Sequence, residues 1–256
     1  MSTPLNSAAG VGSAGGSTTL SPVIEARGLS VGYGVIPVVR ELDLCVSPGE
    51  IVALLGVNGA GKTTTVRALA GELKPTAGEV WFNGAPTTAP LHKRAKDGLR
   101  YITEERSVFM GLSTADNLRL GGQDPEASLA LFPELRKLLN RRAGLLSGGE
   151  QQMLTLARAL GGSPKVLLVD ELSLGLAPLV FERLLTAVRA AADRGTAVVL
   201  VEQHIRQALE VADRAYVLNR GRVALAGDAS DLLGRIDEIE QTYLATAELG
   251  DSGEER

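Results

Sequence analysis

Short runs of aliphatic residues alternate with longer amphipathic stretches over much of the chain. Four such runs, bounded by polar or turn residues, cover 51–55, 166–169, 197–201 and 216–218. A continuous apolar run of this length is typical of a strand buried on both faces of a mostly parallel sheet. Segments of about 15 residues with helical spacing of apolar positions separate the last three runs. Strands and helices that alternate in this way predict a parallel α/β sheet.

The same pattern predicts further elements toward the N-terminus. Residues 23–46 favour extended segments with turns, and a helical pattern follows from about Lys62 to Leu73, where Lys74 and Pro75 close it. Further strands are expected at 78–84 and 99–103. From about Ser113 to Arg142 the apolar positions have helical spacing with no strand candidate, and another helix is expected at 147–161. We therefore predict that a helical insertion near 104–160 interrupts the sheet.

Composition narrows the class of protein. The chain has 256 residues, of which 45% are apolar, so it can bury the core of one large or two small domains. A net charge of −4 argues against nucleic acid as the main partner. Cys45 is the only cysteine, which excludes a disulfide within the chain.

The two ends differ in composition from the rest. Residues 1–22 are rich in Ser, Gly, Ala and Thr, with no charge before Glu25, and we expect a disordered extension rather than a secretory signal. The segment 247–256 is expected to be a flexible acidic tail. No window reaches the roughly 18 apolar residues of a membrane-spanning helix. The sequence therefore predicts a cytoplasmic protein that would serve a membrane only by docking.

A glycine-rich segment follows the first apolar strand. Residues 56–63 fit the P-loop template G-x-x-x-x-G-K-[ST] at every required position. In such a loop, backbone N–H groups and the N-terminus of the following helix bind phosphate oxygens. Lys62 would reach the β- and γ-phosphates of ATP, and the Thr63 hydroxyl would hold Mg²⁺. A glycine-rich turn that binds nothing fits this sequence much less well. The expected nucleotide-binding residues are Gly56, Asn58, Gly59, Ala60, Gly61, Lys62, Thr63 and Thr64.

Two carboxylates end the apolar run at 166–169. Asp170 and Glu171 would lie at the carboxyl edge of the sheet, where ligands bind in open α/β folds. We expect Asp170 to contact Mg²⁺ through water and Glu171 to polarise the water that attacks ATP. Taken alone, the pair could be a solvated acidic loop, but the upstream P-loop favours the catalytic interpretation.

The segment Leu146–Gln152 carries a family resemblance. Its sequence LSGGEQQ resembles the signature motif LSGGQ of ABC ATPases, with Glu150 where glutamine is commonest. Taken alone, Ser147 could simply cap a helix. The resemblance covers about 23–245 and implies an α/β P-loop NTPase of the ABC type at 23–246, with an N-terminal antiparallel β subdomain and a helical subdomain at about 104–160. It also implies a head-to-tail dimer in which the signature of one subunit contacts ATP on the other through Ser147, Gly148, Gly149 and Glu150.

Two further site residues follow from the same resemblance. Tyr33 stands where the family places an aromatic side chain that stacks on adenine. Glu104 stands at the Q-loop position, where most members have a glutamine that contacts Mg²⁺. Leu172 departs from the usual proline after the catalytic glutamate, and the loss of a φ-locked residue would loosen the placement of that carboxylate.

Two residues could occupy the switch position, which is the position that contacts the γ-phosphate of ATP. Spacing from Glu171 favours Gln203, with His204 as the alternative, and adjacent side chains on an extended segment point in opposite directions. For His204 the alternative is an ordinary surface or helix-start histidine, and His92 is expected to be an exposed histidine.

A narrower resemblance is to branched-chain amino acid importer ATPases of the LivF type. The segments that carry it are 32–34, 104–109, 132–135, 173–178 and 201–203. It implies ATP and Mg²⁺ as ligands, a second ATPase subunit (a LivG-like partner or a second copy), two membrane permease subunits and, indirectly, an extracytoplasmic solute-binding protein. Nucleic acid is not expected as a partner. The protein would be peripheral on the inner face of the plasma membrane.

Several alternatives remain at this point. The transported solute could instead be urea, a short amide or an exported lipid, and the chain could be a non-transport ABC ATPase or a regulatory nucleotide-binding module. Permease docking is expected around 104–145, where Phe109, Met110 and Leu112 are apolar, although these residues could equally belong to the core.

Overall fold

A computed structural model describes residues 21–34, 36–105, 107–120 and 125–248. Of the extension expected at 1–22, only residues 21 and 22 fall within these ranges. Of the tail expected at 247–256, only residues 247 and 248 do, and both belong to a helix.

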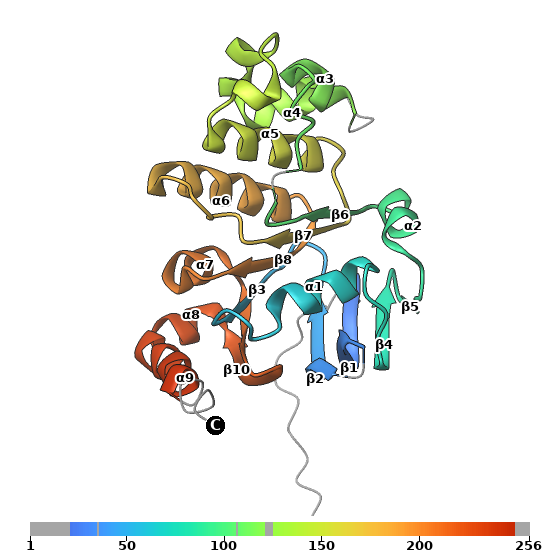
Figure 1. Ribbon diagram of the computed structural model, residues 1–256, viewed down its shortest axis with the longest axis vertical. Helices are drawn as coiled ribbons and strands as arrows, with labels where there is room; N and C mark the ends of the chain where they lie inside the picture. The colour runs from blue at the N-terminus through green and yellow to red at the C-terminus, as the bar shows by residue number, and fades with distance from the viewer. Residues whose placement is uncertain (1–20, 35, 106, 121–124, 249–256) are drawn as a thin grey trace, which may run out of the picture.

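A six-stranded sheet forms the centre of the molecule (Figure 1). Its order is β10-β9-β3-β8-β7-β6; β10 pairs antiparallel with β9, and all other neighbouring strands are parallel. All residues of β3, β7 and β8 are buried, as expected of strands that are covered on both faces. The parallel α/β sheet predicted from the apolar runs is therefore confirmed. The strands are β3 (Ile51–Gly56), β6 (Leu99–Ile102), β7 (Val166–Asp170), β8 (Ala197–Glu202), β9 (Arg214–Asn219) and β10 (Arg222–Asp228).

A second, antiparallel sheet has the order β2-β1-β4-β5. The extended segments at 23–46 form its hairpin, and the strand expected at 78–84 is β4, which ends at Phe82, with a turn at 83–84 that leads to β5. Helix α1 (Lys62–Ala70) joins the two sheets, because Val66 and Leu69 belong to the same apolar cluster as residues of both. This apolar cluster packs against the P-loop and supports it. The strands are β1 (Ile24–Tyr33), β2 (Ile36–Val46), β4 (Ala77–Phe82) and β5 (Ala85–Pro86).

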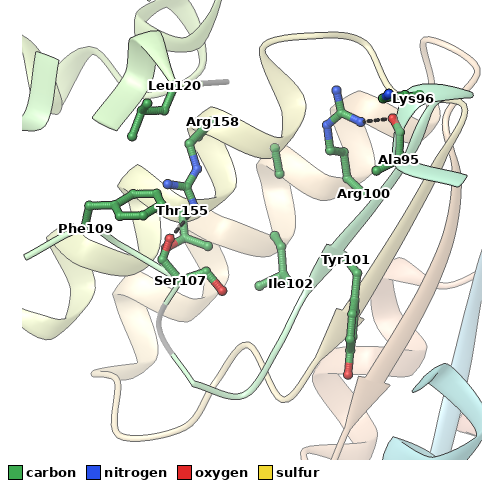
Figure 2. A pocket seen from close by; sticks show the side chains of 11 residues that line it. Ala95, Lys96, Arg100, Tyr101, Ile102, Ser107, Phe109, Leu120, Thr155 and Arg158 are labelled. Carbon is green, nitrogen blue, oxygen red and sulfur yellow. Dashed lines mark hydrogen bonds between the residues drawn. The ribbon is translucent and has the colours of Figure 1, made fainter. Parts of the chain in front are cut away.

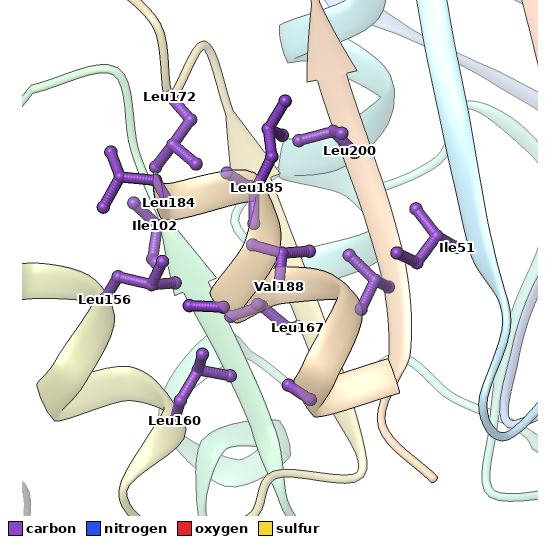
Figure 3. Packing of buried hydrophobic residues seen from close by; sticks show 14 of the residues in the cluster. Ile51, Ile102, Leu156, Leu160, Leu167, Leu172, Leu184, Leu185, Val188 and Leu200 are labelled. Atoms are coloured by element: carbon purple, nitrogen blue, oxygen red, sulfur yellow. The ribbon is translucent and has the colours of Figure 1, made fainter. Parts of the chain in front are cut away.

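Helices cover the other face of the main sheet. The longest is α6 (Pro178–Ala192), which begins with a proline at its first turn and packs Leu184 and Val188 into a second apolar cluster (Figure 3). The acid-rich segment from Asp237 forms a helix, with Ile239 fully buried. The remaining helices of this face are α7 (Ile205–Val211), α8 (Ala229–Leu233) and α9 (Ile236–Glu248), whereas α2 (Leu91–Lys96) packs against the cluster that contains α1.

The helical insertion lies at one end of the molecule, beyond β6 (Figure 1). The region expected to be helical over 113–142 is broken into short pieces. Ser113 caps the first, and Pro133 starts a 3₁₀ turn instead of continuing a helix. The pieces are α3 (Thr114–Arg119), α4 (Pro125–Leu131), η1 (Pro133–Leu138) and η2 (Ala143–Leu145), followed by α5 (Gly148–Leu160). Across the described ranges, no helix is both long and apolar enough to cross a bilayer.

Candidate nucleotide-binding site

The P-loop connects β3 to α1. Gly59 and Gly61 have φ values of 80° and 104°, a region that residues with a Cβ rarely enter. A Cβ on Gly61 would also lie 2.9 Å from Cγ2 of Val39. Gly61 is the N-cap of α1 and has no side chain, so it cannot accept a hydrogen bond from the first backbone N–H groups of the helix. This geometry leaves the donors of the helix N-terminus available to an anion.

Lys62 folds back over this loop. Its Nζ donates to the carbonyl oxygens of Gly56, at 2.9 Å, and of Val57, at 3.2 Å, and lies 4.0 Å from Oε1 of Glu171. Burial lowers the pKa of Lys62, and the carboxylates of Glu171 and Asp170 partly oppose that effect. The ammonium group therefore lies at the junction of the P-loop and the acidic end of β7.

Asp170 is almost completely buried between two hydroxyl groups. The Thr63 hydroxyl donates to its Oδ1 at 3.2 Å, and the Tyr101 hydroxyl donates to its Oδ2 at 3.5 Å. Burial raises the pKa of Asp170 to about 6, and the nearby carboxylates of Glu171 and Glu104 add to the rise, whereas the Thr63 bond opposes it. Burial also raises the pKa of Tyr101. Because burial makes the charged form of Asp170 unfavourable, a cation bound beside the carboxylate would stabilise it.

Glu171 has a backbone conformation that is unusual for a residue with a side chain. Its φ is 53°, and its N–H donates to the Val201 carbonyl oxygen at 3.1 Å. Gln203 donates from Nε2 to Oε1 of Glu171 at 2.8 Å. His204 is the N-cap residue that precedes α7; it is exposed, and its ring centroid lies 5.8 Å from that of Phe181. The structure thus brings Gln203, rather than His204, to the catalytic candidate.

A cavity of about 270 Å³ lies over the P-loop. Ala60 is buried and bonds within the loop, so it contributes to the shape of the loop rather than to the cavity wall. Tyr33 is half exposed, and its hydroxyl accepts a hydrogen bond from Nη1 of Arg67 at 3.3 Å. Residues lining the cavity are Val38, Asn58, Gly59, Gly61, Lys62, Thr63, Thr64, Glu104 and Glu171.

The oxygen groups here suit Mg²⁺ bound together with phosphates. Mg²⁺ favours oxygen ligands, and proteins commonly bind it through one or two carboxylates plus substrate phosphates. In the part of the chain that the structure describes, no cluster of three or more His, Cys, Asp or Glu side chains could hold a metal ion. The Thr63 hydroxyl and Asp170 therefore fit an ion whose remaining ligands come from a nucleotide and water.

The segment that resembles the signature motif lies apart from this cavity. Ser147 caps α5, with its hydroxyl accepting from the Glu150 N–H at 3.3 Å, and the Glu150 carboxylate accepts from the Ser147 N–H at 2.6 Å. This reciprocal pair is a capping box, and neither residue lines the P-loop cavity. One chain thus carries two separate candidate anion-binding surfaces.

Two polar residues near the site, and one at the opposite end of α1, were not singled out from the sequence. Tyr101 is the penultimate residue of β6 and Glu202 the last of β8, so their positions at strand ends were the available signal. Buried Arg94 bonds to the carbonyl oxygens of Ala68 and Leu69 at the end of α1, which no local pattern indicates.

A buried strand, a glycine-rich loop and a helix that begins with Lys-Thr define a P-loop nucleotide-binding domain. Comparison with known proteins narrows this class. The family model described as "ABC transporter" matches residues 39–173, which is more than half of the chain. The chain therefore belongs to the ABC transporter family. It is an ATP-binding and ATP-hydrolysing component of such a transporter.

Similar proteins cover most of the chain. The high-affinity branched-chain amino acid transport ATP-binding protein BraG of Pseudomonas aeruginosa is 38% identical, over 84% of this chain and 97% of its own length. The probable branched-chain amino acid transport ATP-binding protein LivF of Archaeoglobus fulgidus is 37% identical, over 80% and 92%. The lipopolysaccharide export system ATP-binding protein LptB of Escherichia coli is 32% identical, over 86% and 96%.

Solved structures agree on the fold. An ATP-binding subunit of an ABC transporter is 26% identical and superposes with a TM-score of 0.74, over 88% of this chain and 99% of its own. A dimeric post-hydrolysis ATP-binding cassette bound to ADP and Pi is 23% identical, with a TM-score of 0.71, over 80% and 98%. The fold expected from the family resemblance is thereby confirmed.

Proposed function

We propose that this chain binds and hydrolyses Mg·ATP to drive the import of branched-chain or related hydrophobic amino acids through a membrane permease. The ATPase part of the proposal rests on the connected group at the P-loop cavity, which consists of Lys62, Thr63, Asp170 and Glu171. The amino-acid part rests on BraG and LivF, whose names state that function and which align over most of their length.

The proposed chemistry assigns a role to each side chain. The P-loop amides and Lys62 bind the phosphates, and Thr63 and Asp170 hold Mg²⁺, with Glu104 lining the same cavity. When bound, Mg²⁺ neutralises charge on the phosphate oxygens. Glu171 accepts a proton from the attacking water, and Gln203 orients the Glu171 carboxylate through the 2.8 Å bond to Oε1. Tyr33, which is half exposed and does not line the cavity, stacks on the adenine.

A second ATPase subunit completes the site in this proposal. The signature segment from Ser147 to Glu150 does not line the P-loop cavity of its own chain, so a second subunit is needed to bring an equivalent segment to it. Dimeric cassettes among the solved structures support this arrangement. The partner is either a second copy or a related, LivG-like ATPase.

A groove of about 560 Å³ between the main sheet and the helical insertion is the proposed docking site for the permease (Figure 2). Ile102, Phe109 and Leu120 give it an apolar surface. Phe109 and Met110 are about half exposed and Leu112 is 38% exposed, so the interpretation that these three are core residues is wrong. The groove fits an amphipathic helix from a membrane subunit.

The rim of the groove is basic. Lys96, Arg100 and Arg158 line it, and none of the described residues that line it is acidic. Arg158 lies over the Phe109 ring at 5.6 Å and donates to the Ser107 carbonyl oxygen, as Figure 2 shows. We therefore expect the docked helix to carry acidic residues beside its apolar face. Docking there would place the chain peripherally on the inner face of the plasma membrane.

Substitution of Glu171 tests the ATPase part. Glu171→Gln should retain ATP binding and lose about 10²–10⁴-fold in turnover, the range for loss of a general base. The matched control is Glu182→Gln, an exposed glutamate on α6, which should leave turnover unchanged. Near-normal hydrolysis by Glu171→Gln would remove this residue from the base role.

Two further measurements test the partners and the solute. Phe109→Glu should weaken co-purification with the permease, whereas Val223→Glu, on the distant β10, should not. In proteoliposomes that contain the whole transporter, leucine, isoleucine or valine on the solute-binding protein should stimulate ATP turnover. Stimulation by a lipid instead would favour the export function that the LptB names suggest.

A further inference from the structure

The loop after β7 holds Glu171 in a conformation that needs support. A φ of 53° at a residue with a side chain is strained and persists only where the surroundings fix it. The Glu171 N–H is bonded to Val201 on β8, which fixes one end of the turn. The side chains that fix the other end come from the two residues that follow.

Leu172 anchors the loop by burial alone. It is 1% exposed and packs near Leu184 and Ile102 in the cluster of Figure 3. An apolar contact of this kind is non-directional, and leucine does not lock φ as proline does. Leu172 therefore holds the loop to the core without setting the direction of the Glu171 carboxylate.

Ser173 is held by two directional bonds to one carboxylate. Its N–H donates to Oε1 of Glu202 at 3.1 Å, and its hydroxyl donates to Oε2 at 2.7 Å. Glu202 is completely buried, and burial raises its pKa while the Ser173 bonds oppose that rise. Burying a carboxylate costs free energy unless its oxygens accept hydrogen bonds. We therefore infer that Glu202 has a role other than filling space in the core.

Glu202 also joins the strands that carry the rest of the site. It is the last residue of β8, opposite Leu55 of β3 at the start of the P-loop, and Val201 before it lies opposite Asp170. Gln203 after it donates to Glu171. The backbone of this one segment therefore contacts both the P-loop strand and the loop that bears the catalytic candidate.

We propose that Glu202, through its paired bonds to Ser173, is a positioning residue that sets the direction of the Glu171 carboxylate during ATP hydrolysis. This inference rests on the proposed base role of Glu171. The pair supplies the rigidity that leucine at position 172 cannot provide. Glu202 itself does not touch the nucleotide in this scheme, so its loss affects turnover and leaves ATP affinity nearly intact.

The experiment measures kcat and ATP dissociation constants for the full chain. Glu202→Met should lower kcat by about 10²-fold, the cost of misplacing a reacting group by roughly 1 Å, with an ATP dissociation constant within about threefold of the wild type. Glu202→Gln can still accept from the Ser173 N–H and donate to its hydroxyl, and should keep kcat within about threefold. Ser173→Ala should lower kcat by about 2–10-fold, as expected for loss of one hydrogen bond.

The control is Thr196→Val near the opposite end of β8. Thr196 is also buried, and its hydroxyl donates to the Pro164 carbonyl oxygen at 2.9 Å, so the variant loses a comparable bond far from the P-loop. It should lower the midpoint of thermal unfolding and leave kcat within about twofold. Adding Ser173→Ala to Glu202→Met should lower kcat no further, because both changes remove the same contact.

The outcomes separate this inference from the proposed function. Unchanged kcat in Glu202→Met, or equal losses of kcat in Glu202→Met and Glu202→Gln, would overturn the positioning role of Glu202. Unchanged ATP turnover in Glu171→Gln would instead overturn the base role of Glu171. The Thr196→Val control shows how much kcat falls for a given fall in the unfolding midpoint. If the loss of kcat in Glu202→Met is no larger than its own fall in midpoint accounts for on that scale, the positioning role is also overturned. If Glu202→Met does not fold, Ser173→Ala decides the question, and a normal kcat there counts against the pair.

Discussion

The buried carboxylate of Asp170 should lower the stability of the nucleotide-free protein. Asp170 is 1% exposed, and its pKa is raised from 3.8 to about 6, mainly by burial. The folded state therefore holds the Asp170 proton more tightly than the unfolded state does. Between these two pKa values stability falls as the pH rises, and the whole penalty is present above about pH 6.

The size of the effect follows from the shift. A difference of about 2 pKa units at 1.36 kcal/mol each is about 3 kcal/mol, an upper figure for what Asp170→Asn gains at pH 8. Asparagine has the same shape and can still accept a bond from Thr63 or Tyr101. For a chain of this size, the gain should raise the midpoint of thermal unfolding by roughly 6–12 °C. At pH 4 the two proteins should unfold nearly together.

The assay is calorimetric or urea-induced unfolding of both proteins at several pH values between 4 and 8. Exposed Asp97→Asn serves as the control and should stay within about 0.5 kcal/mol of the wild type throughout. With saturating Mg·ATP the order should reverse, because only the wild type keeps the carboxylate for the metal. A variant that is no more stable than the wild type at pH 8, or a difference that does not shrink on acidification, would refute the reasoning.

Three further predictions rest on single substitutions. Lys62→Ala should abolish measurable Mg·ATP binding, and undiminished affinity in a fluorescent-nucleotide titration would count against the phosphate role of the lysine. Gln203→Ala should reduce ATP turnover more than His204→Ala does, because only Gln203 contacts Glu171; the opposite order in steady-state assays would assign the switch to the histidine. Arg94→Met should destabilise by about 2–4 kcal/mol in urea unfolding, since it leaves buried carbonyl oxygens unpaired. Exposed Arg136→Met, at a surface ion pair, should change stability by less than about 1 kcal/mol, and equal losses in the two would contradict the burial argument.

Local patterns in the sequence predicted the parts of the site that are local in the structure. The P-loop is one continuous segment, so its spacing alone placed Lys62 and Thr63 correctly at the start of a helix. The apolar runs predicted the central strands because those strands are buried on both faces. Strand β10 was not predicted, although residues 223–226 form a short apolar run, and the structure leaves most of this antiparallel edge strand exposed.

The contacts that complete the site join distant segments, and these could not be predicted. Tyr101 meets Asp170 across 69 positions, and Ser173 meets Glu202 across 29. Which strand ends lie side by side depends on the strand order β3-β8-β7-β6, and one sequence does not specify that order. The prediction of helix over 113–142 was only partly correct for a different reason, because apolar spacing persists there while Pro133 ends the α-helical stretch and starts a 3₁₀ helix.

Calorimetric titration of the purified chain with Mg·ATP tests the central claim most directly. We predict saturable binding to the wild type and to Glu171→Gln, and none to Lys62→Ala. Heat of binding that is absent from the wild type at millimolar Mg·ATP, or unchanged in Lys62→Ala, would contradict a nucleotide site at the P-loop.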